Sequence, residues 1–204
     1  MGIPAFLDAP QVQERLNNFH FAAIHASRFS FGVERLRSVR ESMFFRTFLH
    51  SCEVMQNPGK ASIHIIGAAH DKFLEVFSGV LEARGGVHVM AVAGLEGSDE
   101  LSTKETAVCE RKNGSMTTYK LCASDFGLQE TDPHKSLTAF ETAKEVQLLF
   151  ERGEGSLKDA VIYNAGIRIY LGKKANDIAE GIRLAKSAVE NGQALAMWKK
   201  LREV

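Results

Sequence analysis

Residues 159–195, DAVIYNAGIRIYLGKKANDIAEGIRLAKSAVENGQAL, decide the fold of this chain. Apolar residues recur near the 3.6-residue period of a helix in both halves of the stretch. They are Val161, Ala165, Ile169 and Leu171 in the first half, and Ile178, Ile182, Ala185 and Val189 in the second. Asn191-Gly192 is typical of a left-handed helix end. The small residues between the aliphatic ones predict two closely packed helices, with Asn164 as a polar exception on the first buried face.

Upstream of this stretch, strand and helix patterns alternate. Residues 62–67 and 87–93 are short apolar runs, and the amphipathic segment 72–83 between them ends before Gly85-Gly86. A strand, a helix and a second strand within about 30 residues are typical of two parallel strands joined by a crossover. We therefore expect a parallel pair of strands in the middle of the chain.

The following segment has a different character. Residues 106–110 and 116–121 favour strands, and Lys112-Asn113-Gly114 between them predicts a tight hairpin turn. Residues 136–152 return to a helical pattern. Together these patterns predict one α/β domain over residues 1–204, in which helices cover a mixed sheet.

The first quarter of the chain gives weaker signals. Residues 10–18 predict a short helix and residues 19–24 a strand. Over residues 32–55 the apolar positions follow a helical period again, so that Val39 and Phe48 are among the side chains expected to face inward.

Composition excludes several classes of protein. The 204 residues hold 25 Lys and Arg against 25 Asp and Glu, so no overall positive field attracts nucleic acid or an anionic membrane. No apolar run approaches the roughly 20 residues of a membrane helix, and residues 1–14 lack the pattern of a signal peptide. Three widely spaced cysteines argue against a disulfide framework. We therefore expect a cytoplasmic protein.

The sharpest local motif is GLEGSDELS at residues 94–102, directly after a predicted strand. Ligand sites in α/β folds lie at the carboxyl ends of strands, and glycines there let the backbone turn tightly around a bound group. The adjacent carboxylates of Asp99 and Glu100 offer the oxygen ligands that Mg²⁺ prefers, with phosphates and water completing its shell. The alternative is an acidic turn that is only solvated.

A second group of residues lies in the segment 32–58. Val39-Arg40, Arg46-Thr47 and Asn57-Pro58 follow one another at intervals of six and eleven positions. At 100° per residue, Arg40 and Arg46 share no narrow helix face unless the helix breaks between them. Both arginines could simply be solvated or paired with neighbouring glutamates. They could also bind a ligand, because the planar fork of arginine suits a carboxylate or an aromatic ring.

These motifs together resemble anthranilate phosphoribosyltransferases and other family-three glycosyltransferases. The helical stretch around NAG and EGIRLAKSAVENGQAL is similar to their carboxyl-terminal helices. The spacing of Val-Arg, Arg-Thr and Asn-Pro is also theirs. Residues 99–102, Asp-Glu-Leu-Ser, match one for one the family segment that helps to bind the magnesium ion of the ribosyl donor.

The resemblance implies a fold like the carboxyl-terminal domain of nucleoside phosphorylases and phosphoribosyltransferases. It implies transfer of phosphoribosyl from 5-phosphoribosyl 1-pyrophosphate to an aromatic amine in tryptophan biosynthesis. By the same resemblance Asp99 and Glu100 would hold Mg²⁺, while Arg40, Arg46 and Asn57 would contact substrates, Arg40 touching the aromatic acceptor.

The chain also departs from the family pattern. Residues 30–33 replace a His-Pro-Ala-Met segment that contacts the acceptor, and His50 replaces an asparagine. Residues 53–55, Glu-Val-Met, replace Gly-Pro-Leu. These departures are similar to those of a divergent branch of the family, some of whose members have been linked to nucleic acid. The alternative function is therefore a non-catalytic homologue that uses the basic residues 28–46 to bind nucleic acid or a phosphorylated ligand.

The family's GTGGD loop, whose backbone N–H groups cradle pyrophosphate, corresponds to sequence before residue 1. The resemblance therefore implies a partial domain, without the amino-terminal helical domain. We expect this chain to be inactive alone, and to require a missing amino-terminal segment or to self-associate through exposed phenylalanines of the segment 29–48.

Overall fold

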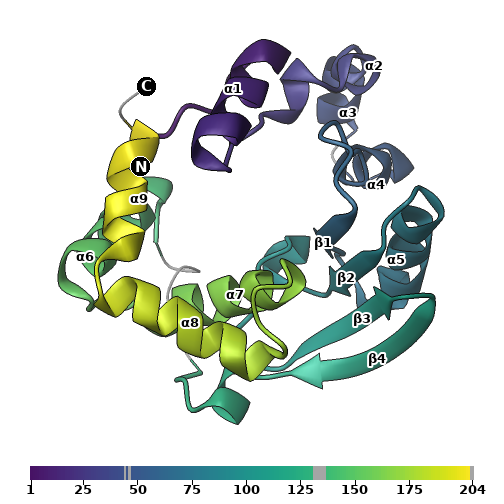
Figure 1. Cartoon of the computed structure of the whole chain (residues 1–204). Coiled ribbons are helices and arrows are strands. Elements are labelled where there is room, and N and C mark those ends of the chain that lie inside the picture. The colour runs from purple at the N-terminus through teal and green to yellow at the C-terminus, as the bar shows by residue number, and fades with distance from the viewer. Residues whose placement is uncertain (44, 46, 131–136, 203–204) are drawn as a thin grey trace. The chain divides into compact units, whose positions relative to one another are not determined.

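The computed structural model describes residues 1–43, 45, 47–130 and 137–202, and the chain divides into two compact units (Figure 1). The first unit comprises residues 61–195, and the second comprises residues 2–60 with the carboxyl-terminal residues from 196 onward. The first unit contains the sheet and its covering helices, whereas the elements of the second are helical. The assignment of residues 1–204 to a single domain stays a prediction.

The first unit is built on a four-stranded sheet in the order β1-β2-β3-β4. β1 and β2 pair in parallel, and the β2–β3 and β3–β4 pairs are antiparallel. Asn113 and Gly114 both have positive φ, 52° and 79°, in the turn between the last two strands. The predicted mixed sheet, parallel pair and hairpin are therefore confirmed. The strands are β1 (Ile63–Gly67), β2 (His88–Val92), β3 (Thr106–Lys112) and β4 (Ser115–Leu121).

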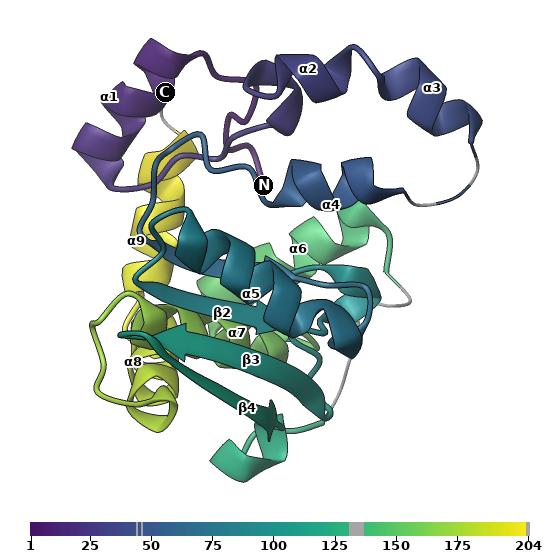
Figure 2. The same ribbon diagram turned by 90° about the vertical axis from the view of Figure 1, so that its right-hand side faces the viewer.

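One face of the sheet is covered by α5 (Leu74–Ala83), which follows the short 3-10 helix η2 (Asp71–Phe73) (Figure 2). Val89 and Ala91 of β2 and Cys109 of β3 have no exposed surface. The Oγ of Ser78 on α5 lies 3.3 Å from the Sγ of Cys109, which identifies the sheet face that α5 covers.

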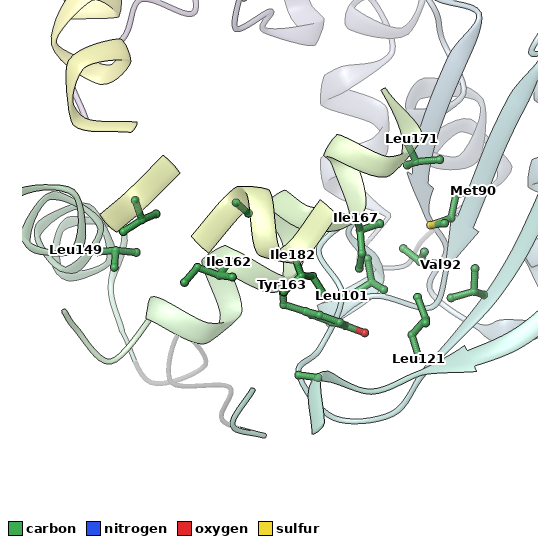
Figure 3. Packing of buried hydrophobic residues seen from close by; sticks show 14 residues of the cluster. Met90, Val92, Leu101, Leu121, Leu149, Ile162, Tyr163, Ile167, Leu171 and Ile182 are labelled. Atoms are coloured by element: carbon green, nitrogen blue, oxygen red, sulfur yellow. The ribbon is translucent and has the colours of Figure 1, made fainter. Parts of the chain in front are cut away.

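The main core lies on the other side of the sheet, where α7 (Lys158–Leu171) packs against α8 (Ile178–Glu190) (Figure 3). Met90 and Val92 of β2 meet Ile167 of α7 in this core. α6 (Ala139–Arg152) adds Leu149, which has no exposed surface. The predicted helical hairpin and the covering of the sheet by helices are confirmed.

The close approach of the two helices depends on glycine. A Cβ atom on Gly181 of α8 would lie 2.2 Å from the carbonyl oxygen of Gly166 on α7, and one on Gly166 would lie 2.5 Å from Ile182. Both positions therefore exclude any larger residue at this spacing. The predicted left-handed stop is also present, since Gly192 has a φ of 79°.

The predicted buried face of α7 is only partly correct. Val161, Ala165 and Ile169 are half-buried, whereas the fully buried apolar residues are led by Ile162 and Tyr163. The reason is that α7 packs against both the sheet and α8 and therefore buries two sides. A single helical stripe cannot describe such a helix.

The second unit contains the remaining helices. α1 begins after Asp8, whose carboxylate accepts the Gln11 backbone N–H in a capping box. The Nη2 of the buried Arg15 donates to the carbonyl of Leu201 at 2.7 Å, near the end of α9. Its helices are α1 (Ala9–Phe19), α2 (Phe31–Glu34), α3 (Arg37–Ser42), α4 (Phe48–Val54), the 3-10 helix η1 (Ala26–Arg28) and the larger part of α9 (Gln193–Arg202).

Two predictions for this unit are wrong. Residues 20–25 form an extended segment and no strand, because the unit that contains them has no strand among its described residues. The backbone N–H of His20 bonds to Leu16 and that of His25 bonds to Ala5. The single helix predicted over residues 32–55 is broken into three short ones. Val39 and Phe48, expected to face inward, are 52% and 75% exposed, because helices this short change direction before an apolar stripe can form.

Candidate functional site

The glycine-rich loop begins directly after β2 and lies against the end of β1. A Cβ atom on Gly67, the last residue of β1, would come within 2.0 Å of the Ser98 backbone. One on Gly94 would lie 2.2 Å from the Ser98 carbonyl oxygen. Because β1 and β2 are parallel, the loop, with its 3-10 turn η3 (Leu95–Gly97), is held at the carboxyl ends of both strands. This is the usual place for a ligand site in an α/β fold.

Two side chains of α7 fix this loop. Asn164, 7% exposed, accepts the Leu101 backbone N–H at 2.9 Å and donates to the Leu101 carbonyl at 3.0 Å. One turn further along, the Nη2 of Arg168 donates to the Asp99 carboxylate at 2.8 Å and to its carbonyl at 3.2 Å. Arg168 also bonds to Asn164, so that the two side chains form one clamp.

Asp99 and Glu100 lie side by side in the clamped loop, and both are exposed. Arg168 engages one oxygen of Asp99, whereas no hydrogen bond or ion pair of the Glu100 carboxylate is found among the described residues. The described residues also include no group of three or more His, Cys, Asp or Glu side chains able to hold a metal ion. The two carboxylates therefore fit a Mg²⁺ ion that shares its shell with phosphate and water, rather than an all-protein cage. Their role in metal binding stays a prediction.

Arg40 and Asn57, which are predicted to contact substrates, lie in the second unit. Arg40 of α3 forms an ion pair with Glu53 of α4, and its side chain is only 11% exposed. Asn57 lies half-buried in the turn after α4, where its carbonyl accepts the Lys60 N–H at 3.1 Å. Arg46 lies outside the described residues. Arg40 lies in α3, which ends at Ser42, and α4 begins only at Phe48.

The departures from the family pattern have structural roles here. The Nδ1 of His50 accepts the Thr47 backbone N–H at 3.0 Å, which fixes the start of α4. The buried Ser30 donates to the Gln56 side chain at 3.0 Å. Glu53 is the partner of Arg40. His50 and Glu53 are therefore both engaged within the unit.

Three side chains that shape these sites have no role, or only an indirect one, that the sequence alone predicts. Arg168 carries no sequence signal, because its partner Asp99 is 69 positions away. Asn164 stands out as a polar residue on an apolar face, and that signal marks the clamp. Glu53 stands out only as a departure from the family pattern.

A further polar cluster surrounds Glu110 on β3. Its carboxylate accepts hydrogen bonds from Tyr119 at 2.6 Å and Tyr170 at 2.8 Å, and lies 2.5 Å from the Nε2 of His88. Burial acts to raise the pKa of Glu110, but the hydrogen bonds from Tyr119, His88 and Tyr170 outweigh it and lower the pKa. Burial and Glu110 raise the pKa of Tyr170 to about 12. The cluster borders a cavity of about 290 Å³ that Lys112 also lines.

The family model for the α/β domain of the glycosyl transferase family matches residues 1–195, and the chain belongs to this family. Its relatives include the anthranilate phosphoribosyltransferase of Marinomonas sp. strain MWYL1, 34% identical over 95% of this chain and 57% of the relative. Another is the enzyme of the same name from Acetivibrio thermocellus, 29% identical over 96% of this chain and 57% of the relative.

Solved structures give the same result. The anthranilate phosphoribosyltransferase of Thermus thermophilus superposes with a TM-score of 0.84 at 25% identity, covering 98% of this chain and 60% of that one. The Saccharomyces cerevisiae enzyme in complex with PRPP and Mg has a TM-score of 0.84 at 20% identity, covering 99% and 59%, and shows the fold alone. The recognised family and fold class are confirmed. The chain spans 56% to 61% of the length of the curated relatives reported for it. No helix in the described part of the chain is long and apolar enough to cross a membrane.

Proposed function

We propose that this chain supplies the metal-binding and acceptor-side residues of a phosphoribosyltransferase of the anthranilate type. The complete protein would transfer phosphoribosyl from 5-phosphoribosyl 1-pyrophosphate to an aromatic amine, in tryptophan biosynthesis as the resemblance implies. The observation that carries this proposal is the loop of Asp99 and Glu100, clamped by α7 at the carboxyl ends of two parallel strands.

Asp99 and Glu100 would hold Mg²⁺ beside the pyrophosphate of the donor, where the ion neutralises the charge of the leaving group. Arg168 keeps Asp99 in place, and the exposed Glu100 is free to bind the ion. Arg40, Arg46 and Asn57 would contact substrates, with Arg40 touching the aromatic acceptor. No nucleophilic side chain is needed, because this chemistry depends on positioning and charge neutralisation.

The rival proposal, a non-catalytic module that binds nucleic acid through residues 28–46, has less support. Arg37 is paired with Glu34 and Arg40 with Glu53, so two of the basic side chains are neutralised internally. A phosphate backbone would have to compete with both carboxylates. We therefore favour the enzyme.

The test is calorimetric titration with 5-phosphoribosyl 1-pyrophosphate, with and without Mg²⁺, of the chain complemented by an amino-terminal segment that carries the GTGGD loop, since we expect the chain to require that segment. We expect binding that requires Mg²⁺ and that is weakened about tenfold or more by Asp99→Ala and by Glu100→Ala, because each removes a charged ligand. Both variants should keep a stability within about 1 kcal/mol of the wild type, since exposed ion pairs contribute little.

Glu190→Ala is the matched control. Glu190 is an exposed carboxylate of the same unit that pairs with Lys186 at 4.0 Å, so its removal makes the same charge change far from the loop in sequence. Two results would contradict the proposal: donor binding that does not depend on Mg²⁺, and equal affinities for wild type, Asp99→Ala and Glu100→Ala. Either result would mean that residues 94–102 form an acidic turn that is only solvated.

A further inference from the structure

Arg40 is already occupied by a carboxylate of its own chain. Its Nη1 donates to the Oε2 of Glu53, and the two side chains are 11% and 21% exposed. The Nε of Arg40 is buried and has no hydrogen-bond partner among the described residues. Glu53 thus engages one nitrogen of the guanidinium, and the bidentate edge that a carboxylate prefers is not fully used.

The charges around this pair are balanced. Arg37 lies against Glu34, with its Nε 2.7 Å from Oε1, in the turn before Arg40. The hydrogen bond from Arg37 is the main cause of the lowered pKa of Glu34, and the charge of Arg40 adds to it. Two arginines and two glutamates therefore cancel in one small cluster. An anionic ligand gains no net attraction from it while Glu53 stays in place.

Glu53 belongs to a short segment, residues 53–56, in which two side chains accept hydrogen bonds from elsewhere in the same unit. Three residues further along the chain, Gln56 accepts the hydroxyl of Ser30, which is 6% exposed. By the resemblance, Ser30 is one of the residues 30–33 that replace the acceptor-contacting segment of the family, and Arg40 is the arginine expected to touch the acceptor. In this chain the segment 53–56 therefore supplies a hydrogen-bond partner to each of these two side chains.

We propose that Glu53 competes with the carboxylate of an aromatic acceptor for Arg40, and so sets the affinity and selectivity for that acceptor. The inference rests on the acceptor role of Arg40 in the proposed function. An aromatic amine that carries a carboxylate must displace Glu53, because two carboxylates beside one guanidinium repel each other. An aromatic amine without a carboxylate meets no such competition.

The experiment measures binding of anthranilate to the purified chain by its fluorescence, with aniline as the probe that lacks the carboxylate. Neither the ribosyl donor nor Mg²⁺ is present, so failure of donor binding at Asp99 and Glu100 leaves the result readable. We expect Glu53→Gln to bind anthranilate about tenfold tighter or more than the wild type. The affinity for aniline should change by less than about twofold, a selectivity that a merely structural role of Glu53 would not produce.

Glu34→Gln is the matched control. It removes one carboxylate from the same cluster but leaves the pair of Arg40 with Glu53 intact, so it should not give the tenfold gain. The double variant Arg40→Gln and Glu53→Gln should lose the gain. Thermal unfolding verifies that each variant is folded, and Glu53→Ala provides a second substitution at the same position.

Three results would overturn the proposal. One is a folded Glu53→Gln or Glu53→Ala variant that binds anthranilate no more tightly than the wild type does. This includes the case in which neither the variant nor the wild type binds anthranilate. Another is an equal gain in Glu34→Gln, which would assign the effect to net charge. The last is loss of folding in both Glu53 variants, which would make the ion pair structural.

Discussion

Replacing Gly181 with alanine tests whether the contact between α7 and α8 determines the stability of the α/β unit. The added Cβ atom would lie 2.2 Å from the Gly166 carbonyl oxygen, where an unstrained contact needs about 3.5 Å. The obstacle is backbone, so no side-chain rotation relieves it. The two helices must separate by about 1 Å over a contact that runs along both, which disturbs the packing of Ile182.

Overpacking of this kind costs about 3 kcal/mol, and the better helix propensity of alanine returns about 1 kcal/mol. We therefore expect a net loss of about 2 kcal/mol, which corresponds to a fall in Tm of about 4–8 °C for a chain of this size. Thermal and urea unfolding followed by far-UV circular dichroism measure both quantities.

Gly79→Ala provides the comparison within the same unit. Gly79 is also a helical glycine, on α5, but an added Cβ would lie 3.5 Å from the end of the Arg111 side chain, an ordinary contact. This variant should be as stable as the wild type or more stable by up to about 1 kcal/mol. A Gly181→Ala protein within about 0.5 kcal/mol of the wild type would refute the reasoning, as would equal losses in the two variants.

Two further predictions concern buried polar groups. Because the folded-state pKa of Glu110 is lowered, its charged form stabilises the fold above the unfolded-state pKa, and this contribution disappears as pH falls through the folded-state value. Glu110→Gln should therefore lose stability at pH 7, and its deficit against the wild type in urea unfolding should shrink between about pH 5 and pH 3; a deficit that is constant with pH would contradict this. The Tyr163 hydroxyl is buried with no hydrogen-bond partner among the described residues, so Tyr163→Phe should keep or raise Tm. A loss above about 1 kcal/mol would show that the hydroxyl has a partner.

Local signals made most of the α/β unit predictable. The turn residues Asn113 and Gly114 and the short apolar runs predicted the parallel pair and the hairpin, because these features depend on neighbours in sequence. The buried face of α7 was harder, since packing on two sides depends on elements far along the chain. The strand predicted for residues 19–24 was wrong for a related reason: strand propensity has little effect where the same unit has no other strand among its described residues.

The candidate sites were predictable to different degrees. Asp99 and Glu100 stand out because glycines and carboxylates follow a strand directly. Arg168, which holds Asp99 in place, did not stand out, because the two residues are 69 positions apart in the sequence. The ion pair of Arg40 with Glu53 joins two helices on either side of a break, and a sequence interpretation with one continuous helix could not place it.

Helix α7, which forms much of the core, also holds the loop of Asp99 and Glu100 through Asn164 and Arg168, and these two side chains stabilise different parts of the loop. Removing the Asp99 carboxylate breaks an exposed ion pair, which solvent largely replaces. Leu101 has no exposed surface, and its backbone N–H and C=O are both bonded to the Asn164 amide. Removing that amide therefore leaves two buried backbone groups without their side-chain partner. Asn164 therefore fixes the loop backbone and Arg168 orients one carboxylate upon it. Because both project from α7, a change that moves α7 against α8, such as Gly181→Ala, is expected to disturb the loop along with the core.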